Sequence, residues 1–315
     1  MKAEIRAIGT YAPERVLLNE ELIGIKGINT SDEFIREKFG VRERRVAENE
    51  NTSDLGVKSV EIALKKANMK KEDLDAIVVA TMTPDLQCPS TACIIQEKLG
   101  LKGIPAFDLS AFCSGYVYGL DTVARMLDNR MKGDSYKNIA FVTAEKMSGI
   151  LDYSDRTVSP IFGDIGCTTI VSKSEKDKVI SSYLYADGSG KDALIIPEGG
   201  RYLKMEGKDV YDFATELFPK LVKETLRKAE MHLDDVDWIF PHQANVNIIK
   251  KGLEALGLGM EKTFLNMDKY GNTAAASIPL AIGEGIEKGK VKRGDILLCV
   301  GFGAGWTGGG IVLEF

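Results

Sequence analysis

A chain of 315 residues, 44% hydrophobic and 28% charged, has the composition of a folded globular protein and is long enough for two domains or an internal duplication. This composition excludes the disordered, collagen-like and disulfide-scaffold classes. The net charge of −5 offers no basic field to hold a polyanion, so we expect no nucleic-acid partner.

The five cysteines are odd in number and widely scattered, which argues against a disulfide framework and favours reduced thiols in the cytoplasm. They are Cys88, Cys93, Cys113, Cys167 and Cys299. Charged residues occupy the amino terminus where a signal peptide needs an apolar run, and no stretch approaches the ~18 to 20 apolar residues of a membrane span. We therefore predict a cytoplasmic protein that is neither exported nor membrane-spanning.

The first half of the chain alternates predicted helix and predicted strand. Residues 56–68 carry apolar side chains at helical spacing, and residues 76–80 form a short, fully apolar strand. An extended segment at 104–109 leads to a helix that Cys113 opens, and another apolar run follows at 139–142. Alternation of this kind is typical of parallel sheets.

Of the five cysteines, Cys113 is the one whose predicted position favours a reactive thiol. It lies at the predicted amino terminus of a helix, where backbone N–H groups favour a thiolate by lowering the thiol pKa. Gly115 and Gly119 would let that helix approach its neighbours closely. The alternative is a small buried hydrophobic residue, the commoner role of a free cysteine, and we favour that role for Cys93 and Cys167.

The second half repeats the pattern. Residues 213–229 are predicted as a helix and 238–240 as a strand. Asn272 then opens another helix, in the place that Cys113 holds in the first half, either as a functional residue or as a plain helix N-cap. Pro279 inside that helical pattern predicts a kink or an irregular turn.

Three landmarks recur in the same order in both halves. Residues 66–78 and 228–240 share Lys, Ala, Met, two Asp and Ile at the same relative positions, and a Leu-Gly-Leu triplet and an apolar strand follow in each half. Chance likeness of two amphipathic passages is the alternative. The repeat predicts two similar α/β halves, residues 1–173 and residues 174–315.

The two histidines differ in their surroundings. His232 lies in the polar segment before a strand, so we expect it on the surface. His242 follows directly after a buried strand, and the carboxyl ends of parallel strands are where sites form. A structural histidine with satisfied hydrogen bonds is the alternative for His242.

Residues 301–310 are the richest glycine run. Gly303, Gly305 and Gly308 nominally match a dinucleotide-binding fingerprint, but that motif needs a following helix, strand and acidic residue, for which no chain remains. A tight turn that brings backbone N–H groups close to a ligand is the better interpretation.

Taken together, these motifs resemble the β-ketoacyl-acyl-carrier-protein synthase III family of thiolase-fold condensing enzymes. Cys113 lies in Ala-Phe-Cys-Ser-Gly, His242 in Pro-His-Gln-Ala-Asn, and Asn272 in Tyr-Gly-Asn-Thr-Ala. The likeness runs from end to end and includes residues 30–33, 40–44, 161–164 and the terminal Gly-Phe-Gly-Ala-Gly.

The resemblance implies an α/β, thiolase-like fold of two βαβαβαββ halves in five αβαβα layers, a homodimer, and an acyltransferase without metal or redox cofactor. Cys113 would take an acyl group from acyl-CoA. His242 and Asn272 would hold the carbonyl oxygen of a malonyl thioester while CO₂ leaves, and the backbone N–H groups of Cys113 and Ala304 would hold the oxyanion of the condensation. The product would be a 3-oxoacyl thioester of fatty acid or polyketide-type biosynthesis.

The resemblance also assigns the substrate entrance. Phe34, where Trp is frequent in the family, and Arg156 would enclose the adenine of coenzyme A. A half-buried core Phe and a solvated Arg are the alternatives. Further contacts with coenzyme A are expected from Lys38, Lys208 and Asn245.

Cys88 and Phe112 are assigned to the acyl pocket. Cys88 stands where Phe often limits the acyl pocket of the partner subunit, so the smaller residue predicts primers longer or bulkier than acetyl.

An acyl carrier protein is one option for the malonyl donor and malonyl-CoA is the other. Many bacterial members carry basic residues where this chain has Asp212, Asn247 and Glu254. A substitute basic patch would come from Lys204, Lys208, Lys250 and Lys251, although scattered lysines usually form a solvated face.

Cys299 falls where thiolases place a second cysteine as a base, and a buried strand residue is the alternative that we favour. A thiolase also needs a histidine where this chain has Asn272. Two different functions stay open beside the condensation. One is transfer of the Cys113-bound acyl group to an oxygen or nitrogen nucleophile, and the second is a non-catalytic role as partner subunit of a heteromeric synthase.

Overall fold

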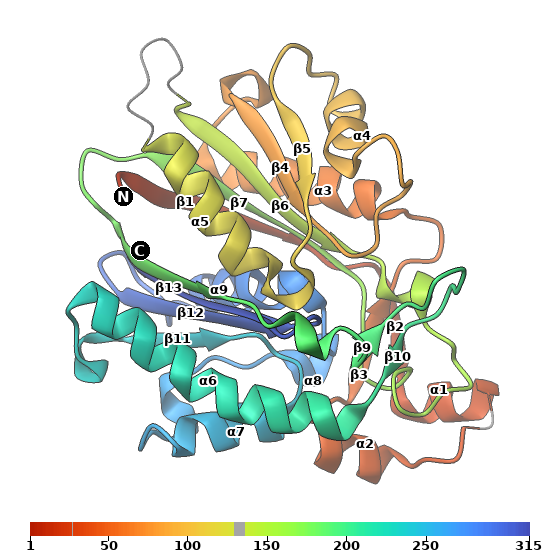
Figure 1. The fold of residues 1–315 in the computed structure, drawn as a ribbon. Coiled ribbons are helices and arrows are strands. Elements are labelled where there is room, and N and C mark those ends of the chain that lie inside the picture. The colour runs from red at the N-terminus through yellow and green to blue at the C-terminus, as the bar shows by residue number, and fades with distance from the viewer. Residues whose placement is uncertain (27, 129–135) are drawn as a thin grey trace.

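The computed structural model describes residues 1–26, 28–128 and 136–315 and contains two sheets with helices between and outside them (Figure 1). The strand order of the larger sheet is β1-β7-β6-β4-β5, and that of the smaller sheet is β11-β12-β13-β8. The larger sheet consists of β1 (Ala3–Tyr11), β4 (Ala76–Ala80), β5 (Ala106–Leu109), β6 (Asn138–Glu145) and β7 (Ile165–Lys173). The smaller sheet consists of β8 (Val179–Tyr185), β11 (Trp238–Pro241), β12 (Ile296–Gly303) and β13 (Thr307–Glu314).

The helices form three layers around these sheets. The pair α5 (Gly115–Leu127) and α9 (Ser277–Glu287) lies between the sheets, and α3 (Thr52–Ala67) and α4 (Thr91–Lys98) cover the outer face of the larger sheet. The outer face of the smaller sheet is covered by α6 (Gly207–Ala229) and α7 (Val246–Glu254). The predicted thiolase-like arrangement of five layers is thus confirmed.

Shorter elements complete the chain near one end of the sheets. They are β2 (Arg15–Leu18) paired with β3 (Glu43–Val46), β9 (Leu194–Ile195) paired with β10 (Lys204–Met205), α1 (Asn19–Lys26), α2 (Asp32–Phe39) and α8 (Met267–Tyr270). In the part of the chain that the structure describes, no helix is both long enough and apolar enough to cross a membrane.

Both sheets are mixed rather than parallel. In the larger sheet β4 runs parallel to β5 and β6, whereas β7 is antiparallel to both of its neighbours. In the smaller sheet only β11 and β12 are parallel. Beyond β11, Thr263 forms an isolated parallel bridge with Ile239. In each sheet the parallel strands place their carboxyl ends at one edge. The segments that follow β4 in the larger sheet and β11 in the smaller sheet meet the inner helices there.

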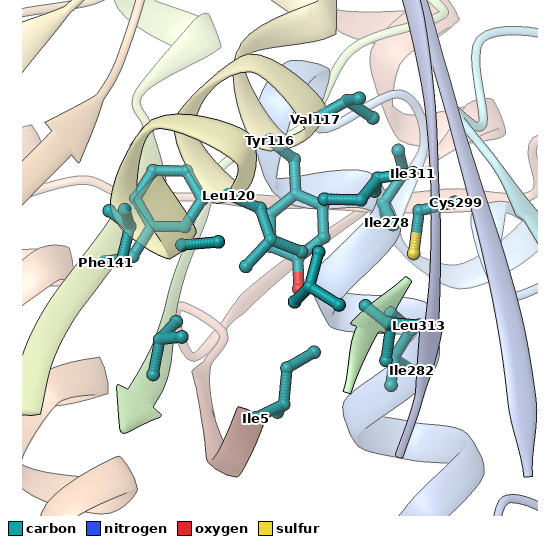
Figure 2. Packing of buried hydrophobic residues seen from close by; sticks show 14 of the residues in the cluster. Ile5, Tyr116, Val117, Leu120, Phe141, Ile278, Ile282, Cys299, Ile311 and Leu313 are labelled. Carbon is teal, nitrogen blue, oxygen red and sulfur yellow. The ribbon is translucent and has the colours of Figure 1, made fainter. Parts of the chain in front are cut away.

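The layer between the sheets is held by close contacts of α5 and α9. Tyr116 of α5 is fully buried and points toward Ile278 and Leu313 of the carboxyl-terminal half (Figure 2). A Cβ atom at Gly119 would lie 2.1 Å from the ring of Phe141, so only glycine lets α5 reach the larger sheet there. The predicted role of Gly119 is confirmed.

The two inner helices start with the same irregular turn. Phe112 and Ala274 both have φ of 48°, each inside a short 3₁₀ turn that precedes α5 or α9. Cys113 therefore corresponds to Ala275, and the prediction that Asn272 occupies the place of Cys113 is wrong. Pro279 lies in the first turn of α9, where N–H groups have no intrahelical partner, so the irregularity precedes the helix instead of kinking it.

Candidate active site

A cavity of about 390 Å³ opens where the inner helices start, and its lining includes residues of α2, α6, α7 and the end of β12. Its wall includes side chains or backbone from both halves of the chain and from α2. Among the residues selected from the sequence, those that line the cavity are Phe34, Lys38, Cys113, Arg156, Lys208, His242, Asn245, Asn272 and Ala304. The remaining two, Cys88 and Phe112, are not among its lining residues.

Cys113 lies at the base of this cavity, in the 3₁₀ turn before α5, with 3% of its surface exposed. The hairpin turn between β12 and β13 packs directly against it. A Cβ atom at Gly303 would lie 2.9 Å from the Cys113 Cβ and 3.0 Å from its backbone nitrogen. Gly303 is therefore required for close approach, and the turn brings Ala304 to the cavity wall beside the thiol.

The expected lowering of the Cys113 pKa is wrong for the structure as it stands. Burial raises the pKa of the thiol to about 12, and the charge of Glu145 acts in the same direction. Burial disfavours the charged form more strongly than the helix end favours it. Cys113 consequently starts as a neutral thiol, and its proton must leave during the reaction.

His242 follows β11 and is almost completely buried, with 1% of its surface exposed. Its backbone N–H donates to the Val300 carbonyl at 2.8 Å, which continues the parallel pairing of β11 with β12. Its Nδ1 lies 2.8 Å from Ser277 Oγ, and its ring packs edge-on against Phe302 with centroids 5.3 Å apart. Ser277 Oγ also accepts from Gln243 N, which fixes the hydroxyl beside the His242 ring.

Burial lowers the pKa of His242 to about 3, so the imidazole is neutral at physiological pH. Below pH 6.5 the unfolded chain takes up a proton that the folded chain does not, and stability falls as the pH falls. Between pH 7 and 5 we expect His242 alone to cost about 2 kcal/mol of unfolding free energy. Urea unfolding of the wild type and of His242→Gln at both pH values measures this difference, and an identical pH dependence would contradict it.

Asn272 is fixed by its backbone and by its side-chain oxygen. Its N–H donates to Ile161 O at 2.8 Å, and its carbonyl accepts from Gly163 N at 3.1 Å. The side-chain Oδ1 accepts from Ala274 N at 2.8 Å. Because Oδ1 is occupied by a backbone donor, the amide presents its Nδ2–H groups as donors toward the cavity.

Cationic side chains surround the outer part of the cavity. Arg156 and Lys38 are exposed, and Arg156 donates to the Asn29 carbonyl at 3.0 Å. Lys208 pairs with Asp212 at 2.8 Å, in contacts that are open to solvent. Phe34 is 45% exposed, which excludes a core position for its ring. This combination of exposed aromatic and cationic groups suits a planar ring with attached phosphates.

Asn245 and Asn247 connect the cavity wall to α2. Asn245 Oδ1 caps α7 by accepting from Asn247 N at 2.8 Å. The Asn247 side chain donates to the carbonyls of Glu37 and Lys38, both at 3.0 Å. Asn247 thus closes the end of α2, which carries Phe34 and Lys38.

The remaining cysteines lie away from the cavity lining. Cys299 is fully buried beside Tyr116 in the core between the sheets, so the thiolase-base alternative is wrong and the buried-strand alternative is confirmed (Figure 2). Cys167 is fully buried, as expected. Cys88 is exposed in the segment before α4. His232 is exposed, as predicted.

Two buried polar residues beside the site were not selected from the sequence. Ser277 orients His242, and Glu145 ends β6 behind Cys113 with none of its surface exposed. A carboxylate at the end of a strand whose centre is apolar is the sequence signal that could have identified Glu145. Phe112 is half-buried in the apolar cluster that includes Cys113 and Ala304.

Comparison with known proteins gives matches along the whole chain. A family model described as 3-oxoacyl-[acyl-carrier-protein] synthase III matches residues 107–188, and the model of its C-terminal part matches residues 226–315. The β-ketoacyl-[acyl-carrier-protein] synthase III of Clostridium acetobutylicum is 40% identical, over 99% of this chain and 98% of that protein. The crystal structure of 3-oxoacyl-[acyl-carrier-protein] synthase III from Aquifex aeolicus superposes with a TM-score of 0.94 at 40% identity, covering 99% of this chain and all of that one.

Proposed function

The chain belongs to the β-ketoacyl-acyl-carrier-protein synthase III family, and we propose that Cys113, His242 and Asn272 carry out the condensation that defines this family. The protein is an acyltransferase of fatty acid biosynthesis that joins an acyl primer to a malonyl thioester. The observation that supports the residue roles is that all three side chains border one cavity, together with Ala304 of the hairpin turn.

In the first half-reaction the Cys113 sulfur attacks the thioester carbonyl of acyl-CoA. The acyl–sulfur bond to coenzyme A breaks as the bond to Cys113 forms, and the thiol proton leaves on the coenzyme A sulfur. The backbone N–H groups of Cys113 and Ala304 stabilise the oxyanion, and the close packing of Gly303 against Cys113 supports this placement of Ala304.

In the second half-reaction His242 and Asn272 hold the carbonyl oxygen of the malonyl thioester. Loss of CO₂ leaves an enolate, so the site needs hydrogen-bond donors rather than a base that removes a carbon-bound proton. The neutral His242, in this proposal with its proton on Nε2, and the Asn272 amide meet this need. The enolate carbon then attacks the acyl group on Cys113, and Cys113 leaves as a thiolate that takes up a proton from solvent to restore the neutral thiol.

The entrance is proposed to hold coenzyme A. Phe34 and Arg156 enclose the adenine, and Lys38 and Lys208 approach the phosphates. Asn245, which lines the cavity, is proposed to contact the arm of coenzyme A that carries the thioester.

Members of the family are named for their acyl-carrier-protein substrate, and for this chain the carrier is proposed to dock weakly. Three lysines near the mouth have another contact or another proposed role: Lys204 lies 3.7 Å from Asp155, Lys251 lies over the ring of Tyr211, and Lys208 is assigned above to coenzyme A. The side-chain amide of Asn247 already donates to two backbone carbonyls at the end of α2. We therefore propose malonyl-CoA as a competent donor beside the carrier-bound form.

We propose a homodimer formed along β5. This strand ends the larger sheet, so its outer backbone groups have no neighbour in the sheet order. Phe107 on β5 is 37% exposed, and Leu86 in the segment that follows β4 is 53% exposed. Light scattering that reports twice the mass of one chain would support the dimer.

Two further parts of the proposal are the division of the chain into halves, residues 1–173 and 174–315, and a cytoplasmic location.

The primer is proposed to be longer or bulkier than acetyl. The cavity wall is mainly apolar, and Cys88 is exposed outside the cavity lining, so in this proposal it contributes to the acyl pocket of the partner subunit. Phe112, half-buried beside Cys113, is retained as the second acyl-pocket residue.

A chain-length series of acyl-CoAs, assayed with malonyl-CoA and with malonyl carrier protein, tests the primer. We expect turnover of propionyl and longer primers at rates at least comparable with acetyl, because a cysteine leaves room that a phenylalanine fills. The matched variant Cys88→Phe should shift preference toward acetyl by about tenfold or more. Strict acetyl preference in the wild type would refute the proposal.

A further inference from the structure

Arg44 is a buried cation that the steps above do not use. It lies on β3 with 1% of its surface exposed, and it has no ion-pair partner among the residues that the structure describes. Burial lowers the pKa of its guanidinium to about 10, so the group is still charged at physiological pH. A buried charge is costly unless hydrogen bonds satisfy it, so the acceptors around Arg44 show what its side chain holds in place.

The acceptors come from two parts of the chain that are far apart in the sequence. Nη1 of Arg44 donates to the Leu17 carbonyl at 3.0 Å, and Nη2 donates to Asn19 Oδ1 at 2.6 Å. Nη2 also donates to the Pro160 carbonyl at 2.7 Å. Arg44 therefore joins the end of β2 and the start of α1 to the segment that begins at Pro160.

That segment, residues 160–163, supports the backbone of Asn272. Ile161 and Phe162 line the cavity, and Phe162 forms an isolated parallel bridge with Asn272. The two hydrogen bonds beside this bridge run from Asn272 N to Ile161 O and from Gly163 N to the Asn272 carbonyl. The position of residues 160–163 therefore sets the position of Asn272.

Arg44 also packs against this segment. A Cβ atom at Gly163 would lie 2.9 Å from the Arg44 Cβ and 2.2 Å from the carbonyl oxygen of Tyr270, two residues before Asn272. Only glycine allows the three stretches of chain to lie so close. Gly163 is thus enclosed by β3 and by the chain that leads to Asn272, which leaves the segment little freedom to move.

A second set of contacts runs from Arg44 to the cavity entrance through Asn19, which is itself 1% exposed. The Asn19 amide accepts from Arg44 on Oδ1, and its Nδ2 donates to Asp32 Oδ1 at 2.8 Å and to the Val41 carbonyl at 2.9 Å. Asp32 is the first residue of α2, and Val41 follows the end of that helix. Asn19 therefore connects Arg44 to both ends of the helix that carries the proposed contacts with coenzyme A.

We propose that Arg44 is a positioning residue that fixes two parts of the site relative to each other: the segment 160–163, which supports Asn272, and, through Asn19, helix α2 at the entrance. The inference rests on the proposed roles of Asn272 and of α2. Arg44 is not among the cavity-lining residues, so it acts through these neighbours and not on the substrate. A guanidinium suits this task because it is planar and donates from two terminal nitrogens in fixed directions.

Arg44→Lys tests the contacts that support Asn272. An ammonium group donates from a single nitrogen and cannot occupy the places of both Nη1 and Nη2, so the segment 160–163 shifts. We expect single-turnover condensation by the pre-acylated enzyme to fall by about tenfold to 100-fold, because a displacement of about 1 Å has an effect of this size. Acylation of Cys113 at saturating acyl-CoA should stay within about threefold of the wild type, whereas a loss of folded protein would lower both rates by the same factor.

Asn19→Asp tests the contacts with α2. Aspartate keeps the acceptor for Arg44 but replaces the amide donor by a carboxylate oxygen, which repels Asp32 and leaves the Val41 carbonyl without its donor. We expect the KM for acyl-CoA to rise several-fold, while condensation at saturating substrate stays close to the wild type. This split between KM and kcat is not produced by a lower content of folded protein.

Arg293→Lys is the matched control. Arg293 also donates to two backbone carbonyls, those of Ile5 at 2.6 Å and Arg6 at 2.5 Å, and it is not among the cavity-lining residues. The same substitution there should leave the KM for acyl-CoA and the ratio of the two half-reactions unchanged.

Hydrogen exchange, read by mass spectrometry of peptides, tests the positioning role without an assay of the reaction. In the wild type we expect slow exchange at the amides of Gly163 and Asn272. In Arg44→Lys exchange at these amides should become several-fold faster. The amide of His242 should not change, because it pairs with the Val300 carbonyl of β12.

Unchanged condensation in Arg44→Lys, an equal loss in both half-reactions, or an unchanged KM in Asn19→Asp would overturn the proposal. If Arg44→Lys does not fold, rapid exchange at Asn272 in the wild type would overturn it as well, since a segment that is held in place does not open readily. Failure of the wild type to acylate would refute the proposed function instead, and the exchange experiment would still test Arg44.

Discussion

Cys113→Ala is expected to abolish formation of the 3-oxoacyl thioester while the enzyme still releases CO₂ from the malonyl thioester at a measurable rate. The first effect follows from loss of the sulfur that carries the acyl group, and we expect a fall of roughly 10,000-fold or more. The second follows because His242 and Asn272, the proposed donors to the enolate oxygen, are positioned by Ser277 and Ala274 and do not depend on the thiol.

Two assays measure this pair of effects: product formation from acyl-CoA and malonyl thioester, and conversion of malonyl-CoA to acetyl-CoA without a primer. Cys299→Ala is the control, because Cys299 is a buried cysteine outside the cavity lining and should leave both rates close to the wild type. Substantial product formation by Cys113→Ala would contradict the assignment of the nucleophile.

Asn272→Ala is expected to produce the reverse pattern. The variant should still accept the acyl group on Cys113 at a rate within about threefold of the wild type, because the proposed donors for acylation are the backbone N–H groups of Cys113 and Ala304. Condensation should fall by about 100- to 1,000-fold, the usual cost of removing one donor to a developing oxyanion. The enolate would keep only the donor of His242.

Single-turnover experiments separate the two steps for this variant. Mass spectrometry follows acylation of Cys113, and addition of malonyl thioester to the pre-acylated enzyme follows condensation. Asn247→Ala is a useful comparison, because it also removes a side-chain amide but one that closes α2 at the entrance. Equal loss of both half-reactions in Asn272→Ala would contradict its proposed role.

Sequence patterns located the strands that carry the site more accurately than the helices beside it. The apolar run at 76–80 coincides with β4, because a short strand buried on both faces must be continuously apolar. The helix predicted to start at residue 213 in fact begins at Gly207. The prediction missed this start because the first two turns are largely exposed and carry no apolar periodicity. Residue types alone do not mark such a start.

The chemistry of the site was only partly predictable. Flanking motifs selected Cys113, His242 and Asn272, and these residues do line one cavity. The pKa of Cys113 was predicted in the wrong direction, because the sequence shows a helix start but neither the depth of burial nor the charge of Glu145, which lies 32 positions further along the chain. Cys88 could not be placed in a pocket either, since its proposed contact belongs to a second chain.

The central claim is that Cys113 carries the acyl group, and intact mass spectrometry after incubation with a panel of acyl-CoAs tests it most directly. We expect the wild type to gain the mass of one acyl group, Cys113→Ala to gain none, and Asn272→Ala to gain the same mass as the wild type. Peptide mapping should place the group on Cys113. A gain that persists in Cys113→Ala, or no gain in the wild type with any acyl-CoA, would contradict the account.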